Sequence, residues 1–212
     1  MKKNIIISLF DLTGIWSDPY RQSGYEVIQI DLQLGVDIMD WDYKNEVDRE
    51  KVYGILNASP CDDFALSGAR WFKEKDNDGR TESSIKIAKK GMEIIEYFNP
   101  EFWVLENPMT RIHKLVPEIG EMKYRFNPCD FAGYLPENKQ DEERYNKMTW
   151  LFGKFNEPIK KRLEPLQKDS PMWTNPNGYS YGSLELKNWR SKTPKGFAKA
   201  FFNSNNNMKV GK

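Results

Sequence analysis

The first half of the chain contains short, continuous apolar runs separated by segments with helical spacing. Such runs are typical of strands that are covered on both faces of a parallel sheet. We predict four of them, over 4–10, 26–31, 52–56 and 102–105. Strands that alternate with helices in this way predict a doubly wound, mostly parallel α/β domain.

Two helices are predicted between these strands. Apolar residues recur at helical spacing from Ile85 to Phe98, which predicts an amphipathic helix that follows Thr81 and ends at Asn99-Pro100. Asp18-Pro19 is typical of a helix start and Gly24 of a helix end.

The second half gives weaker patterns. We predict a solvated, mostly charged loop over 136–144 and a loop-rich stretch over 167–182. The sequence "FAKAFF" at 197–202, preceded by "KTPKG", predicts a C-terminal helix. The tail is expected to be disordered.

Composition narrows the class of protein. The chain has 212 residues, with 32 Lys and Arg against 31 Asp and Glu, so its formal charge of +1 disfavours a general polyanion-coating protein but allows a local basic patch. Two cysteines and one histidine are too few for a disulfide framework or a structural zinc site, so no metal is expected. The apolar run at the N-terminus is short and stops at Asp11, so it predicts a strand rather than a signal peptide. No stretch approaches the ~20 apolar residues of a membrane span, and we expect a soluble, cytoplasmic protein.

Polar groups follow the predicted strands where each strand ends. They lie at 11–16, at Asp31, in the loop "NASPCDDF" at 57–64 and at 106–108. Because ligands of doubly wound sheets bind at the carboxyl ends of the strands, we expect these groups to line one site.

The first two of these groups favour an adenosine-containing cofactor. A strand followed by a turn with Gly14 and then a helix start is a general nucleotide-binding arrangement, and an ordinary turn fits nearly as well. Asp31 can accept hydrogen bonds from two ribose hydroxyls, or cap a helix. Asp37 can receive an adenine amino group, or serve as a plain turn residue.

Cys61 and Glu106 are the candidate reactive groups. A cysteine in a loop at a strand end is a reactive thiolate if its pKa is lowered, and otherwise a small apolar filler. Glu106, held between a hydrophobic strand and a proline, is a candidate acid with a raised pKa, or a surface carboxylate. We interpret Cys129 as structural and His113 as a helix-surface residue.

These residues resemble those of the cytosine-C5 DNA methyltransferases. "ASPCDDFALSG" resembles their catalytic loop and "FWVLENP" the strand that supplies a glutamate and an asparagine. "FDLTGIWSDPYRQSGYEVIQIDL" resembles their cofactor segment, "GVDI" their adenine-contacting segment and "TPKGFAKAFF" their closing helix. The first part of the cofactor segment is also similar to short phage-encoded methylase-like proteins.

The resemblance implies a Rossmann-like fold that binds S-adenosylmethionine and methylates a cytosine flipped out of DNA. It assigns catalytic roles to Pro60, Cys61, Glu106, Asn107 and Arg144. It assigns cofactor contacts to Phe10, Asp11, Leu12, Thr13, Gly14, Trp16, Asp31, Leu32, Asp37, Ile38 and Ser59. In this family the cysteine adds to C6 of the pyrimidine, the glutamate holds the N3 and amine edge, and C5 then takes the methyl group.

The chain also departs from the family. Trp16 replaces a glycine of the cofactor loop, and Arg144 and Lys147 stand where an arginine-rich motif is usual. We expect a cofactor-binding catalytic domain over 1–157, a short irregular region over 158–190 in place of a target-recognition domain, a closing helix over 191–203 and a disordered tail over 204–212. The short region leaves alternatives open. They are specificity supplied by an accessory protein, RNA or free pyrimidine nucleotides as substrate, and a non-catalytic nucleic-acid-binding or decoy protein.

Overall fold

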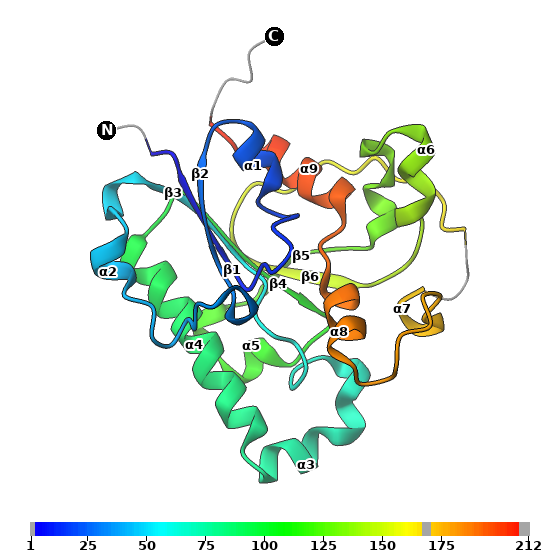
Figure 1. The fold of residues 1–212 in the computed structure, drawn as a ribbon, viewed down its shortest axis with the longest axis horizontal. Helices are drawn as coiled ribbons and strands as arrows, with labels where there is room; N and C mark the ends of the chain where they lie inside the picture. The colour runs from blue at the N-terminus through cyan, green and yellow to red at the C-terminus, as the bar shows by residue number, and fades with distance from the viewer. Residues whose placement is uncertain (1–2, 167–170, 208–212) are drawn as a thin grey trace.

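The computed structural model describes residues 3–166 and 171–207, and it shows an α/β fold built on one six-stranded sheet (Figure 1). The strands lie in the order β2-β1-β3-β4-β6-β5. Their bounds are Ile5–Leu9 for β1, Glu26–Ile30 for β2, Val52–Asn57 for β3, Phe102–Pro108 for β4, Met122–Phe126 for β5 and Thr149–Lys154 for β6. β2, β1, β3 and β4 pair in parallel, whereas β6 is antiparallel to both of its neighbours. The predicted doubly wound, mostly parallel sheet of Rossmann-like type is confirmed.

The order of the strands fixes where a ligand crevice lies. The chain leaves β1 toward β2 on one side, whereas β3 pairs with the opposite edge of β1. The order in which the chain adds strands therefore reverses between β1 and β3. Sheets of this kind bind ligands in the crevice outside the carboxyl ends of the two strands at such a point.

Helices cover both faces of the sheet. The two predicted helices are α1 (Asp18–Gln22) and α4 (Arg80–Phe98), and Asn99 ends α4 in the left-handed conformation with φ of 43°, followed by Pro100. The other helices are α2 (Tyr43–Glu46), α3 (Phe72–Asn77), α5 (Ile112–Leu115), α6 (Glu137–Gln140), α7 (Pro171–Thr174), α8 (Leu184–Ser191) and α9 (Lys195–Ser204). No helix in the described part of the chain is long and apolar enough to cross a membrane.

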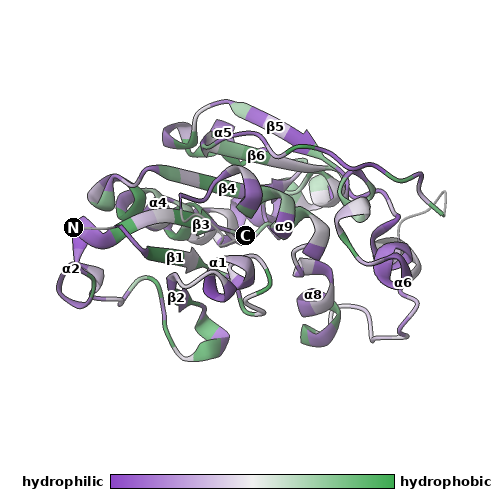
Figure 2. Ribbon diagram, turned by 90° about the horizontal axis from the view of Figure 1, so that it is seen from above, coloured by the Kyte–Doolittle hydropathy of each residue, from purple (hydrophilic) through white to green (hydrophobic). Residues whose placement is uncertain are grey.

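The core has one layer on each face of the sheet because successive side chains of a strand point to opposite faces. Ile6 packs with the α1 and α9 side chains, whereas Ile5 and Ile7 pack with Ile94 and Ile95 of α4. In Figure 2 β1 is coloured as hydrophobic along its length, whereas α2 and α6 are mostly hydrophilic.

An aromatic cluster joins the predicted closing helix to the sheet. Phe197 of α9 stacks on Phe126 with ring centroids 4.1 Å apart, and both rings are buried. Phe201 packs edge-on against Trp16 at 5.9 Å. α9 is therefore part of the main core.

Residues 136–144 are a correction to the predicted solvated loop. They form α6 and a 3-10 turn, and Glu143 is buried. Its carboxylate accepts hydrogen bonds from the backbone N–H groups of Lys195 and Gly196, the latter at 2.9 Å. Glu143 therefore neutralises the start of α9, where N–H groups have no partner within the helix.

Two other parts of the second half differ from expectation. The region 158–190, predicted to be irregular, contains α7 and most of α8. The predicted disordered tail starts at 204, yet Asn205 is buried and its side chain bonds both backbone groups of Asn156, at 2.7 and 2.8 Å. Residues 208–212 of that tail, and residues 167–170 of the loop-rich stretch, lie outside the described residues.

Candidate active site

The loop after β1 is a tight turn on the crevice between β1 and β3. Phe10 has φ of 60° and Gly14 has φ of 67°, so two residues adopt the left-handed conformation within five positions. For Phe10 this conformation is strained, and such strain in folded proteins clusters at ligand sites. The buried Asp11 organises the turn, because its Oδ2 accepts hydrogen bonds from Ser8 at 2.9 Å and Ser17 at 3.1 Å. Leu12 and Thr13 lie in the same turn, with Thr13 exposed.

The predicted ribose and adenine contacts follow β2. Oδ1 of the half-buried Asp31 accepts the backbone N–H of Gln33 at 2.8 Å, and no hydrogen bond to Oδ2 is present among the described residues. Burial raises the pKa of Asp31, the Gln33 N–H group opposes this and the charge of Asp11 adds to it. Leu32 is 71% exposed beside it, Ile38 is buried, and Asp37 is exposed with its carboxylate accepting the N–H of Met39 at 2.9 Å.

Trp16 has a different position from the other predicted cofactor residues. Its side chain is fully buried and packs against Phe197 at 5.8 Å and Phe201. The indole therefore fills the space between the loop and α9, and exposes no surface toward the crevice. Its Nε1 has no hydrogen-bond partner in the described structure.

The loop that carries Cys61 begins beside the β1 loop. The N–H of Ala58 donates to the carbonyl of Leu9 at 3.0 Å, which holds the two strand ends together. Ser59 is buried, Pro60 is exposed and Cys61 is half-buried. The structure thus brings the predicted nucleophile loop and the predicted cofactor loop to one edge of the sheet.

Ion pairs and hydrogen bonds fix the far side of the Cys61 loop. Arg111 donates two hydrogen bonds to the carbonyl of Asp63, at 3.1 and 3.2 Å. Lys75 pairs with the Asp63 carboxylate at 2.9 Å, and the Ser84 hydroxyl donates to the same carboxylate at 2.5 Å. Burial opposes ionisation of Asp63, but the bonds from Ser84 and Lys75 hold its pKa below the ordinary value.

Glu106 and Asn107 lie within β4 rather than after it. The strand continues to Pro108 because β6 pairs with its last three residues, beyond the point where β3 ends. Asn107 is buried and its Nδ2 donates to the carbonyl of Ser59 at 3.0 Å, so the strand holds the Cys61 loop directly.

Cys61, Glu106 and Lys147 share one electrostatic environment. Burial, followed by the charges of Asp62 and Glu106, raises the pKa of Cys61 to about 11, and Lys147 acts in the opposite direction. Burial also raises the pKa of the half-buried Glu106, and Lys147 again opposes the rise. Lys147 is therefore the cation that favours ionisation of both groups.

Arg144 does not join this group. Its Nε donates to the carbonyl of Glu164 at 2.8 Å and its guanidinium pairs with Asp141 at 3.0 Å. The backbone after Arg144 instead brings Lys147 to Glu106, so the geometry favours Lys147 for the role that the resemblance gave to Arg144.

Helix α8 lies between α9 and α3 in Figure 1. Three contacts tie it to the loops of the site: the Asn188 and Gln33 side chains exchange hydrogen bonds of 2.9 and 3.1 Å, Lys187 lies 3.8 Å from the Asp62 carboxylate, and Lys147 donates to the Arg190 carbonyl at 2.8 Å. The region 158–190 thus contacts the predicted cofactor side, the predicted nucleophile loop and Lys147. Sequence reasoning missed this helix, although Ser183 followed by "LEL" is a helix-start signal: its hydroxyl caps the N–H of Leu186.

The space at Glu106 is nearly filled. Glu106, Lys147, Thr149 and residues 191–194 line a void of about 10 Å³. Such a void holds about one water molecule.

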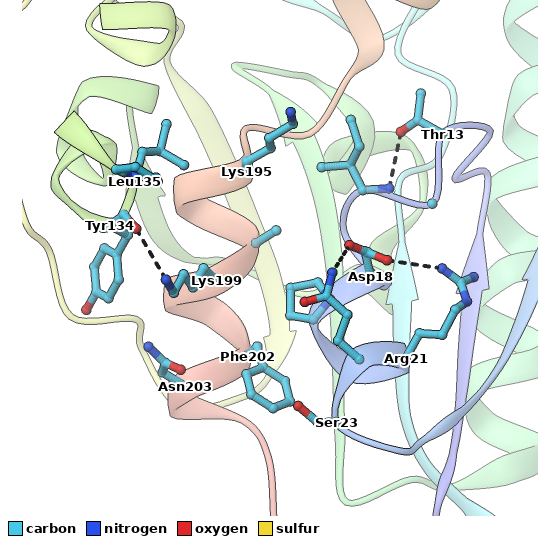
Figure 3. Close-up of a pocket in the computed structure, with 16 residues that line it drawn as sticks. Thr13, Asp18, Arg21, Ser23, Tyr134, Leu135, Lys195, Lys199, Phe202 and Asn203 are labelled. Carbon is cyan, nitrogen blue, oxygen red and sulfur yellow. Dashed lines mark hydrogen bonds and ion pairs between the residues drawn. The ribbon is translucent and has the colours of Figure 1, made fainter. Parts of the chain in front are cut away.

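A second hollow lies on the other side of the cofactor loop (Figure 3). This groove of about 550 Å³ runs between α1, α9 and the turn at Tyr134. Lys199 reaches toward the Tyr134 carbonyl at 3.5 Å, while Arg21 pairs with Asp18 at 3.6 Å. The groove includes Thr13 and Gly14 but neither Cys61 nor Glu106.

The remaining candidates are structural. Cys129 is fully buried, and His113 is half-buried with its ring stacked on Phe152 at 5.6 Å rather than lying on the surface. Within 3–166 and 171–207 no cluster of three or more His, Cys, Asp or Glu residues is placed to hold a metal ion.

The chain is similar to known DNA methyltransferases over part of its length. No protein-family model matches the chain. The chain is 26% identical over 107 residues to a probable DNA (cytosine-5)-methyltransferase of frog virus 3 (isolate Goorha), covering 42% of this chain and 46% of the viral protein. It is also similar, with 13% identity and a TM-score of 0.46, to a solved structure of a candidate DNA modification methyltransferase encoded within an Escherichia coli prophage, covering 77% of this chain and 52% of the other. The chain therefore spans about half the length of each of these two proteins.

Proposed function

We propose that the protein is an S-adenosylmethionine-dependent DNA methyltransferase that acts on C5 of cytosine. The observation that carries this proposal is the shared environment of Cys61, Glu106 and Lys147 beside the acid-bearing loops of β1 and β2. A thiol, a carboxyl with a raised pKa and a cation at one strand edge suit nucleophilic addition to a pyrimidine ring. The viral relative supports the same reaction.

The described residues fit the cofactor. Asp31 keeps one carboxylate oxygen without a protein partner, which suits the donation of ribose hydroxyls. The exposed Leu32 and the buried Ile38 provide apolar contact for adenine, Asp37 an acceptor for its amino group, and the loop from Phe10 to Gly14 a turn for the methionine part. S-adenosylmethionine supplies an electrophilic methyl group when it is bound.

The residues of the chain would perform the other steps. Cys61 loses its proton and its sulfur forms a bond to C6 of the cytosine, which makes C5 nucleophilic. Burial raises the pKa of Glu106, which favours uptake of a proton that the carboxyl would donate to N3 and so offset negative charge that develops on the ring. Lys147 stabilises the thiolate before addition. After C5 has taken the methyl group, loss of the C5 proton returns the electron pair to the ring and the sulfur–C6 bond breaks.

The proposal is tested by methyl transfer from labelled cofactor to mixed-sequence DNA. We expect label in DNA with the wild type and with Cys129→Ala, and none with Cys61→Ala. DNA that contains 5-fluorocytosine should form a covalent adduct with Cys61, because fluorine at C5 prevents the final proton loss. Equal label transfer by Cys61→Ala would refute the mechanism.

The protonated thiol and the nearly filled void at Glu106 favour a second candidate, a non-catalytic methyltransferase fold that binds nucleic acid. Calorimetry with S-adenosylmethionine separates the two, because a protein without catalysis has no reason to keep affinity for the cofactor. If binding is present, single strands, duplexes, RNA and free dCMP are compared as methyl acceptors.

A further inference from the structure

Asn57 is a polar residue at the end of the otherwise apolar strand β3, and it is completely buried. Its Oδ1 accepts two hydrogen bonds from Ser59, one from the backbone N–H at 3.0 Å and one from the hydroxyl at 2.7 Å. Asn57 thereby closes a short turn that begins four residues before Cys61.

Ser59 is held on three sides by buried amides. Asn57 takes its N–H and its hydroxyl, and Nδ2 of Asn107 donates to its carbonyl at 3.0 Å. All three residues are at most 3% exposed. Because buried hydrogen bonds with no competing water are costly to break, this network fixes the backbone two residues before the thiol.

The other side of Asn57 faces helix α4. A Cβ atom at Gly91 would lie 2.7 Å from Nδ2 of Asn57, closer than such atoms approach. A glycine inside a helix is destabilising relative to alanine. Gly91 lies in the middle of the 19-residue helix α4, so the space that the Asn57 side chain occupies is kept at the expense of helix stability.

Nδ2 of Asn57 is buried and has no hydrogen-bond partner in the described structure. Only the oxygen of the carboxamide is therefore used, and it is used twice. A residue kept only for packing would not leave an amide group unpaired in the core, because a buried donor without a partner costs free energy.

We propose that Asn57, seated on Gly91, is a positioning residue that sets the place of the Cys61 thiol relative to Glu106. It acts through Ser59 and touches neither substrate nor cofactor. The inference rests on the proposed function for its catalytic consequence, whereas its effect on Cys61 is a property of the free protein.

Three variants test the proposal in a Cys129→Ser background. Asn57→Ala removes the accepting oxygen, and Gly91→Ala places a methyl group of helix α4 against the Asn57 side chain. Asn57→Asp keeps an accepting oxygen in the same place and replaces the unpaired NH2 group by the second oxygen of a carboxyl group. Asn205→Ala is the matched control, because it also removes a buried, hydrogen-bonded amide but lies at the end of α9, away from Cys61.

We expect Asn57→Ala and Gly91→Ala to raise the rate of Cys61 modification by a disulfide reagent about tenfold, because the loop no longer holds the thiol half-buried. We expect kcat for methyl transfer to fall about 10- to 100-fold with KM for the cofactor changed less than about threefold. Asn57→Asp should stay within about threefold of the parent in both measurements. Combining Asn57→Ala with Gly91→Ala should add nothing to either single change, because both act through one side chain.

The proposal is overturned if Asn57→Ala lowers the melting temperature as Asn205→Ala does but leaves Cys61 modification and kcat unchanged. It is also overturned if Asn57→Asp behaves like Asn57→Ala. If neither the parent protein nor any variant transfers methyl groups, the proposed function fails. The rates of Cys61 modification then still decide whether Asn57 positions Cys61.

Discussion

Cys61 is expected to react slowly in the free protein, and the size of this effect follows from its surroundings. With a pKa of about 11, about one Cys61 thiol in 10³ is ionised at pH 8, against about one in four for an ordinary cysteine. Once ionised, the Cys61 thiolate is about tenfold more nucleophilic than the thiolate of an ordinary cysteine, because nucleophilicity rises with pKa at a slope of about 0.4–0.5. The net rate with a disulfide reagent should therefore be about 20-fold below that of a free thiol.

The assay follows modification of Cys61 in a Cys129→Ser background as the pH rises from about 7 to about 10. The logarithm of the rate should rise by about one for each pH unit without levelling off, because the thiol stays below its pKa throughout. The slope does not depend on how accessible the half-buried thiol is, so burial alone cannot imitate the result. A plateau below about pH 9 in the folded protein would show that the thiol is not held in its protonated form.

The direction of three substitutions tests the cause. Glu106→Gln and Asp62→Asn each remove a negative charge that raises the pKa of Cys61, so both should speed modification at pH 8. Lys147→Met removes the opposing positive charge and should slow it. Lys154→Met, on the exposed end of β6, is the control for a general change of charge and should have no effect. Faster modification in Lys147→Met would refute the electrostatic account.

Three further predictions concern stability and are measured by urea denaturation. Burial raises the pKa of Glu143 in the folded protein, so the folded state binds its proton more readily than the unfolded state does. The free energy of unfolding relative to Glu143→Gln should therefore fall as the pH rises through that pKa. An unchanged difference between the two proteins from about pH 4 to 7 would contradict this. Phe197→Ala should lower the free energy of unfolding by about 3–5 kcal/mol, because it empties the centre of the aromatic cluster; a loss below about 1 kcal/mol would show that the cluster repacks. Gly153→Ala should cost about 1–3 kcal/mol or more, because Gly153 has φ of 119° and a Cβ there would lie 2.5 Å from the Trp103 carbonyl oxygen; a neutral effect would mean that β6 shifts freely.

The parallel half of the fold could be predicted because each strand is buried on both faces. Ile5, Ile6 and Ile7 all have at most 3% exposure, so the strand appears in the sequence as an unbroken apolar run. The two antiparallel strands give no such run. β5 alternates half-buried and exposed residues at the edge of the sheet, and β6 contains Gly153, so neither was recognised.

Glu143 shows why the charged stretch was misread. Its partners, the N–H groups that start α9, lie more than 50 residues later in the sequence. A local pattern of charges indicates solvent, and only the tertiary structure reveals that one carboxylate of the four acidic residues in 136–144 is buried by a helix end.

The part of the candidate site that lies at the ends of parallel strands could be predicted from the sequence. Parallel strands place their carboxyl ends at one edge, so the convergence of the Cys61 loop with the Asp11 and Asp31 loops follows from topology alone. Lys147 could not be distinguished from Arg144 because no motif fixes the register before β6. Asn57 and Gly91 were missed, although an asparagine that ends an apolar strand and a glycine inside a helix are both signals of a close contact.

Helix α8 links the two halves of the proposed reaction. A cytosine ring is much larger than the one-water void at Glu106, so we expect lining residues such as 191–194 or Lys147 to move when a base binds there. Lys147 is bonded to the last turn of α8, and Asn188 of the same helix is bonded to Gln33, which follows Leu32, a proposed adenine contact. Each of these hydrogen bonds contributes about 1 kcal/mol and the exposed Lys187–Asp62 pair contributes less, so the helix is held by only a few kcal/mol of polar contacts. A displacement of α8 that admits the base therefore also loosens the wall of the cofactor crevice, and a cofactor that holds Leu32 and Gln33 in place makes that displacement harder. On the proposed function, binding of the base and binding of the cofactor are therefore coupled through α8.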